Sequence, residues 1–140
     1  CLIQDPHQPK RFTLPTLPAT RHFACWHRPR VNLNQVGDTV AQILNNSGRY
    51  SVQSVIVTNA SVDLTTAQLA VYTGAGATGT AIKSAYALTG NSTSAKVVVT
   101  AATSTDAVSG TPLYIRCTTA QGAAATADVF IYGYDLTFLS

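Results

Sequence analysis

The chain has 140 residues, of which 46% are apolar and 11% are charged, and its formal net charge is +3. The apolar fraction is large enough for a hydrophobic core and therefore excludes general disorder. No apolar run approaches the roughly 18 residues that a membrane-spanning helix needs. Thr, Val, Ala and Gly are abundant and Glu and Met are absent, which disfavours a helical bundle. We therefore expect one small, mostly β protein with no membrane partner.

The first thirty residues differ from the rest in charge and in proline content. Their net charge is +4, whereas residues 31–140 sum to −1. Five of the six prolines lie in this segment, and each removes a backbone donor and disfavours helix before it. We predict an extended basic arm over residues 1–30 that is long enough to lie across a neighbouring molecule. The arm residues expected to make that contact are Lys10, Arg11, Phe12, Arg21, Phe23, Trp26, Arg28 and Arg30.

The sequence is compatible with three kinds of contact for the arm. Docking on a partner subunit is the interpretation that we favour, because the apolar and aromatic residues between the basic ones need a surface to cover them. Wrapping over the arm's own body is the second interpretation. Nucleic-acid binding is the least favoured, since it requires the basic and aromatic side chains to face one strand.

Residues 31–140 have the alternation and punctuation of a β-sandwich domain. Apolar stretches alternate with Gly, Asn, Ser and Thr clusters about every ten residues, as in sandwiches and barrels. The segment 81–88 is also compatible with helical turns, and 60–67 with a short helix. We predict an all-β antiparallel sandwich of about eight strands, for which a jelly-roll-like arrangement is a candidate. The predicted strands are 31–36, 38–44, 49–59, 68–73, 81–88, 95–101, 112–118 and 126–138.

The last predicted strand has bulky residues on both faces. Ala127, Val129 and Ile131 alternate with larger residues, among them Phe130 and Tyr132. A sheet face with Phe130, Tyr132 and Tyr134 in a row is rarely left open to water, so we expect these three residues to form an interface. Closed homo-oligomers are the commonest assemblies, and we expect a trimer.

The sequence contains no recognisable catalytic or metal-binding device. All three histidines, His7, His22 and His27, lie in the arm, where a catalytic base would lack a rigid position. His22, Cys25 and His27 form an H-x-x-C-x-H pattern that matches none of the usual zinc spacings. We therefore expect no enzyme activity, no metal and no cofactor.

Three further motifs have ordinary structural interpretations. The run Gly74–Gly79 fits G-x-G-x-x-G, but no clear helix and no suitably placed acid follow it, so we favour a hairpin loop over a dinucleotide site. Asn45, Asn59 and Asn91 begin Asn-x-Ser/Thr triplets, which we interpret as turn chemistry. Arg49 and Arg116 lie at strands, and we expect each to pair with an Asp rather than to bind a ligand. Of Cys1, Cys25 and Cys117 at most two can be bridged within one chain, and their disulfide state is left open.

Four segments of the sequence together carry a resemblance to known proteins. They are the run GRYSVQSVIVTNAS at 48–61, Val71-Tyr72-Thr73 with its Gly-rich loop, LYIR at 113–116 and TTAQGAAATADV at 118–129. Together they resemble small proteins of tailed bacteriophages that are thought to be virion components. The resemblance covers roughly residues 36–136, leaves the arm outside and includes no catalytic signature.

The resemblance implies a capsid decoration (cement) protein on the capsid surface of a virion, or a related head or tail structural protein. Its partner would be the major capsid protein or another virion protein, and its extended termini would clamp neighbours. One alternative is a receptor- or glycan-binding module of a fibre, tail or neck, although the loops at 73–80 and 104–111 contain no aromatic residue. The other is a lipid-anchored bacterial surface protein, because such proteins begin at a Cys.

Overall fold

The computed structural model describes residues 23–41, 48–93, 98–109 and 112–136. Within these ranges the chain forms nine β-strands and no helix, so the predicted all-β class is confirmed. None of the described residues belongs to a helix that could cross a membrane. The strands are β1 (Phe23–Asn32), β2 (Gly37–Ala41), β3 (Arg49–Thr58), β4 (Gln68–Gly74), β5 (Thr78–Ala87), β6 (Val98–Ala101), β7 (Val108–Ser109), β8 (Leu113–Thr119) and β9 (Thr126–Asp135).

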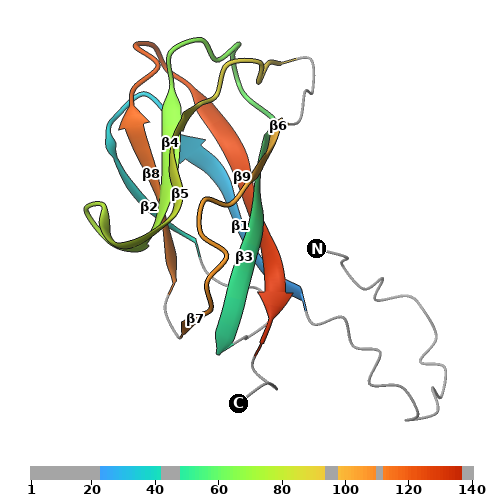
Figure 1. The fold of residues 1–140 in the computed structure, drawn as a ribbon. Helices are drawn as coiled ribbons and strands as arrows, with labels where there is room; N and C mark the ends of the chain where they lie inside the picture. The colour runs from blue at the N-terminus through green and yellow to red at the C-terminus, as the bar shows by residue number, and fades with distance from the viewer. Residues whose placement is uncertain (1–22, 42–47, 94–97, 110–111, 137–140) are drawn as a thin grey trace, which may run out of the picture.

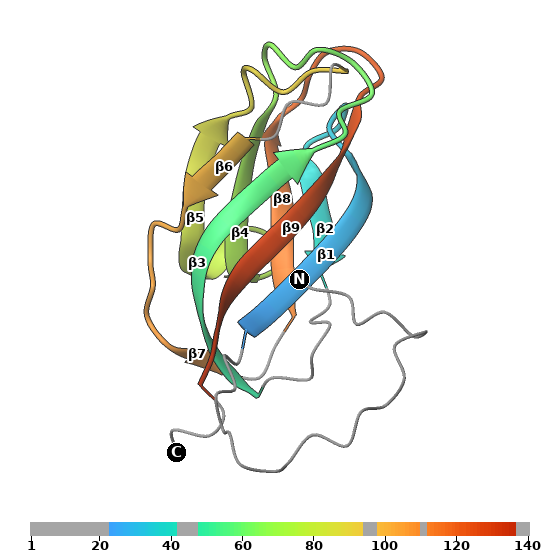
Figure 2. The same cartoon turned by 90° about the vertical axis from the view of Figure 1, so that its right-hand side faces the viewer.

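The strands lie in two antiparallel sheets that pack face to face (Figure 1). One sheet has the order β1-β9-β3-β6, with the two-residue β7 paired to the start of β3, and the other has the order β2-β8-β4-β5. Figure 2 looks onto the first sheet, with β1 at one edge and β6 at the other. The predicted β-sandwich is therefore confirmed.

The order of pairing is that of a jelly roll. With β7 set aside, the first four strands pair with the last four in reverse order: β1 with β9, β2 with β8, β3 with β6 and β4 with β5. Such nested pairing is what results when one long hairpin is rolled into two sheets. The rolled hairpin places β9 in the middle of its sheet, between β1 and β3.

The core fills the space between the sheets, and the alternation of the strands decides which residues enter it. In β9, for example, Ala127, Val129 and Ile131 are fully buried while the residues between them are not. Trp26 of β1 and Tyr50 of β3 meet edge to face, with ring centroids 4.4 Å apart. The largest fully buried side chains are Trp26, Tyr50, Leu33, Leu64, Leu69, Ile82, Leu88, Leu113, Ile115, Ile131, Val31 and Val52.

The predicted boundary between arm and body at residue 30 is wrong. Residues 23–32 form β1, which pairs with β9 along its length. Pro29 is tolerated because β1 is an edge strand and the ladder is irregular between Arg28 and Val31. Arg30 adopts a positive φ of 51° there, and its N–H donates to the carboxylate of Asp128 at 2.9 Å. The bulge therefore accommodates Pro29, a residue that a regular ladder of hydrogen bonds would exclude.

Most of the predicted strands are present, with two further differences. The segment 81–88 is a strand, as predicted, and belongs to β5. The segment 31–36 contains only the last two residues of β1, followed by a turn, and 60–67 contains no helix. The two-residue strand β7 was not predicted, because so short a segment has no measurable period.

The run Gly74–Gly79 lies at the hairpin between β4 and β5, as predicted. Gly76 and Gly79 have positive φ angles of 68° and 73°, which suits glycine. The N–H of Gly76 donates to the carboxylate of Asp38, which also pairs with Arg116 at 2.8 Å. The hairpin tip is thereby anchored to β2 of the same sheet, and Arg116 has the Asp partner that was expected.

Candidate assembly face and an amide-lined hollow

Apolar and aromatic side chains of three neighbouring strands meet on the outer face of the sheet that contains β1 and β9, the sheet nearer the viewer in Figure 2. Phe130, Tyr132 and Tyr134 alternate with buried residues along β9 and therefore point away from the core. His27 of β1 and Ile56 of β3 pair with Phe130 from the two sides. We call these five residues the aromatic face.

The middle of the aromatic face is a stacked pair. The rings of His27 and Phe130 lie 4.2 Å apart with an interplanar angle of 9°. The Nε2 atom of His27 is buried and has no hydrogen-bond partner among the described residues. A buried polar atom without a hydrogen-bond partner is energetically costly, so the stacked pair holds His27 in place against this cost.

Exposure increases toward one end of the face. Phe130, Tyr132, His27 and Ile56 are half-buried by their neighbours, whereas Tyr134 is 51% exposed. Tyr134 is the most exposed of three exposed large hydrophobic residues among the described ones, the others being Val36 and Val40. The structure thus brings together the three predicted residues of the body and adds His27 and Ile56, which the sequence analysis missed as members of the face.

The predicted arm residues have different positions. Arg28 and Arg30 are exposed on the edge strand β1, beside the aromatic face. Phe23 is the first residue of β1 and pairs in register with Tyr134. The prediction that Trp26 contacts a neighbouring molecule is wrong, because its side chain is fully buried against Tyr50 in the core. The other predicted contact residues, Lys10, Arg11, Phe12 and Arg21, lie outside the described residues.

Three further residues that the sequence analysis singled out, Cys117, Asn91 and Asn59, donate hydrogen bonds within the fold. The thiol of Cys117 is buried and donates to the carbonyl of Thr119 at 3.3 Å, and burial raises its pKa, which makes a thiolate unfavourable. Asn91 is buried and donates to the carbonyl of Leu88, and the amide of Asn59 donates to Asp128. The described residues contain no cluster of His, Cys and Asp that could hold a metal ion.

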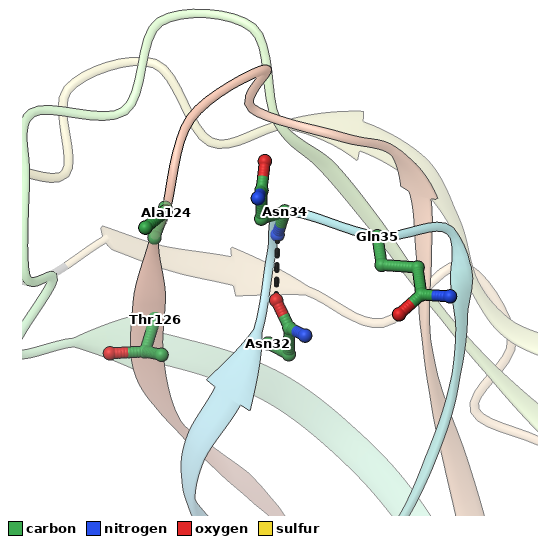
Figure 3. A pocket seen from close by; sticks show the side chains of 6 residues that line it. Asn32, Asn34, Gln35, Ala124 and Thr126 are labelled. Carbon is green, nitrogen blue, oxygen red and sulfur yellow. Dashed lines mark hydrogen bonds between the residues drawn. The ribbon is translucent and has the colours of Figure 1, made fainter.

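A second feature is an open hollow at the end of the sandwich where β1 turns into β2. Its volume is about 490 Å³, which lies within the range of small-molecule sites. One wall carries three carboxamides, from Asn32, Asn34 and Gln35 (Figure 3). The other wall consists of Ala124, Ala125 and Thr126, at the start of β9. None of these six residues is charged.

Backbone hydrogen bonds hold the two walls of the hollow together. The N–H of Leu33 donates to the carbonyl of Ala125 at 2.9 Å, and the N–H of Gln121 donates to the carbonyl of Leu33 at 2.7 Å. Leu33 itself is fully buried and anchors the turn in the core. The N–H of Asn34 donates to the side-chain oxygen of Asn32 at 2.9 Å, the dashed line in Figure 3, which fixes the Asn32 side chain.

The hollow was not predicted from the sequence. The segment 31–36 was interpreted as a strand, so the three carboxamides were not placed on one turn. The signal that could have found it is the pair of Asn residues flanking one Leu before a Gln and a Gly, because Asn side chains commonly bond the backbone two residues on in turns.

Comparison of the chain with protein-family models, with curated proteins and with solved structures gave no match.

Proposed function

We propose that this chain is a non-enzymatic structural protein of a virion, and specifically a capsid decoration (cement) protein that binds the capsid shell and stabilises it. The observation that carries the proposal is the aromatic face. Interface cores are enriched in aromatic residues and depleted in charge, and the five residues of this face fit that description. The partner would be the major capsid protein or another virion protein, together with further copies of this chain.

The position of β1 supports a contribution from the segment that precedes it. Phe23, where β1 begins, pairs with Tyr134, so the chain joins the sandwich at the exposed end of the aromatic face. In the proposal, the basic residues of the N-terminal segment clamp a neighbouring subunit while the aromatic face packs against the assembly. Arg28 and Arg30 extend the same basic character onto the sandwich edge.

The fold is compatible with this function but does not decide it. Jelly rolls occur in viral capsid domains and also in lectins and cupins, so the architecture alone leaves several functions open. The likeness of the sequence phrases to phage virion proteins, noted above, selects the virion among them. The proposal therefore depends on surface chemistry and on sequence resemblance.

The proposal is tested with phage particles assembled without this protein and then mixed with the purified full chain. We expect saturable binding and a higher temperature of particle disruption. The double variant Phe130→Ser/Tyr134→Ser should bind about tenfold more weakly or worse, because two aromatic side chains of an interface commonly contribute more than about 1.4 kcal/mol.

The control is Val40→Ser, which removes an exposed hydrophobic side chain from the other sheet. This variant should bind as the wild type does. Equal binding by the wild type and the double variant would remove the aromatic face from the proposal, and no binding by the wild type would remove the capsid role.

A further inference from the structure

The hollow at the end of the sandwich has the chemistry of a ligand site, and it lies away from the aromatic end of β9. Asn32 pairs in register with Thr126, the first residue of β9, whereas Tyr134 is near the other end of that strand. The two surfaces are therefore separate, and an inference about the hollow does not depend on the proposed virion role.

We propose that the hollow lined by Asn32, Asn34, Gln35, Ala124, Ala125 and Thr126 binds a neutral saccharide. The absence of charge from all six lining residues disfavours an anionic or cationic ligand, since neither would gain a counter-charge for the water it loses. The lack of large apolar side chains disfavours an aliphatic or aromatic ligand. Of these classes of ligand, a neutral and hydroxyl-rich one fits the lining best.

The two walls match the two kinds of surface on a sugar ring. A carboxamide both donates and accepts hydrogen bonds, and so does a sugar hydroxyl, so three carboxamides on one wall can each pair with hydroxyl groups in either direction. The opposite wall presents short side chains, of which Ala124 is exposed, Thr126 is half-buried and Ala125 is buried in the core, and such a small apolar surface suits the C–H face of a ring. In Figure 3 the Thr126 hydroxyl points away from Asn32, so the polar groups of the two walls are not satisfied by each other there.

The site is held in shape before any ligand arrives. The turn that carries Asn32, Asn34 and Gln35 is tied to the opposite wall through Leu33, and Thr126 is fixed by an N–H donated to the Ser61 hydroxyl at 3.0 Å. Gln121, which donates to Leu33, accepts hydrogen bonds from three consecutive backbone N–H groups at Thr65, Thr66 and Ala67. A rigid site loses little entropy on binding, which favours even a small polar ligand.

We expect weak affinity for a single site, with a dissociation constant of about 1 mM, because each neutral hydrogen bond replaces one to water. Display of many copies on one assembly would raise the effective affinity through multivalency.

The test is a titration of the ¹⁵N-labelled full chain with glucose, galactose, mannose, N-acetylglucosamine and their neutral oligomers, followed by NMR. Side-chain NH₂ signals of Asn32, Asn34 and Gln35 report directly on the proposed contacts. We expect these signals to shift in a saturable manner, with one common dissociation constant, for at least one sugar. The absence of any such shift up to tens of millimolar sugar would overturn the proposal.

Two variants separate the site from general effects on the protein. Asn34→Ala/Gln35→Ala removes two exposed carboxamides, and Ala124→Leu fills the hollow without touching them. Each variant should weaken binding about tenfold or more. The first loses one or two hydrogen bonds to the ligand, and in the second the Leu side chain occupies the volume that the ligand needs. The control Ser109→Ala, on β7, should leave the titration unchanged. Unchanged binding in both hollow variants would contradict the proposed site.

Discussion

Gly133 is the residue of β9 at which the sandwich tolerates no side chain. A Cβ built there would meet the carbonyl oxygen of Ser51 at 2.1 Å and the Cα of Val52 at 2.8 Å. Both atoms are backbone, and they lie where the β3–β9 ladder shifts register between Val52 and Ser54. The bulge in β3 therefore requires glycine opposite it.

Gly133→Ala should lower the free energy of unfolding by about 3 kcal/mol, because the backbone of β3 has to move to admit the methyl group. Urea denaturation of the full chain measures this change. Gly37→Ala is the matched control, since a Cβ at Gly37 meets nothing within 4 Å and should leave stability nearly unchanged. Equal stability of the two variants would contradict the close approach of β3 and β9.

Asp38 links the hairpin tip to the sheet through a charge that depends on pH. Burial raises its pKa, but hydrogen bonds from Gly76 and Arg116 and the charge of Arg116 together hold the pKa below its usual value of 3.8. A carboxyl whose pKa is lower in the folded than in the unfolded chain stabilises the fold above the unfolded pKa. That contribution is lost as the pH falls through the folded pKa.

The wild type should therefore be more stable than Asp38→Asn at neutral pH, by no more than about 1 kcal/mol because the ion pair is partly exposed. The difference should decrease as the pH is lowered from about 5 to about 2. Urea denaturation of both proteins across this range measures the effect. A difference that is the same at every pH would show that the charge of Asp38 contributes nothing.

Among the elements, β1 differs most from the prediction, because residues expected in an extended arm form an edge strand of the sandwich. It carries Trp26, the single Trp of the chain, into the core. We expect blue-shifted Trp fluorescence that acrylamide quenches poorly in the folded protein, at every protein concentration. Trp26→Ala should lower the free energy of unfolding by about 4 kcal/mol. Emission typical of water-exposed Trp in the native protein would contradict the placement of β1.

The strands with strong alternation were predictable from the sequence, and β1 was not. β8 and β9 alternate with a clean period of two, and even the doubtful segment 81–88 proved to be a strand. β1 was hidden because Pro29 and its basic neighbours are features of an exposed arm, whereas a bulge on an edge strand accommodates them. No local signal records such a bulge, because its cause is the pairing with β9 across the fold.

The candidate site was only partly predictable for a related reason. The aromatic row on β9 follows from alternation within one strand, so Phe130, Tyr132 and Tyr134 were found. His27 and Ile56 join them only because β1 and β3 flank β9, which is a property of the jelly-roll order. The hollow depends in the same way on Leu33 bonding to Ala125, residues more than ninety positions apart.

At the scale of the whole molecule, both outer faces of the sandwich carry half-buried aromatic residues, Tyr72 and Tyr114 on the β2-β8-β4-β5 sheet among them, and the faces differ in their polar contacts. On the β2-β8-β4-β5 sheet, the hairpin tip is anchored to Asp38, and an ion pair links β2 to β8. The β1-β9-β3-β6 sheet presents the aromatic face, with an unpaired Nε2 of His27 among its described contacts. We therefore expect the β1-β9-β3-β6 sheet, and not the β2-β8-β4-β5 sheet, to be the surface through which copies assemble.

The measurement that tests this account most directly is the mass of the full chain in solution, determined by light scattering over a range of concentrations. We predict a closed oligomer, a trimer in the simplest case, that the Phe130→Ser/Tyr134→Ser variant dissociates toward monomer and that Val40→Ser leaves intact. Circular dichroism of each variant should show a folded β protein. A wild type that stays monomeric, or a double variant with the same mass as the wild type, would contradict the assembly role of the aromatic face.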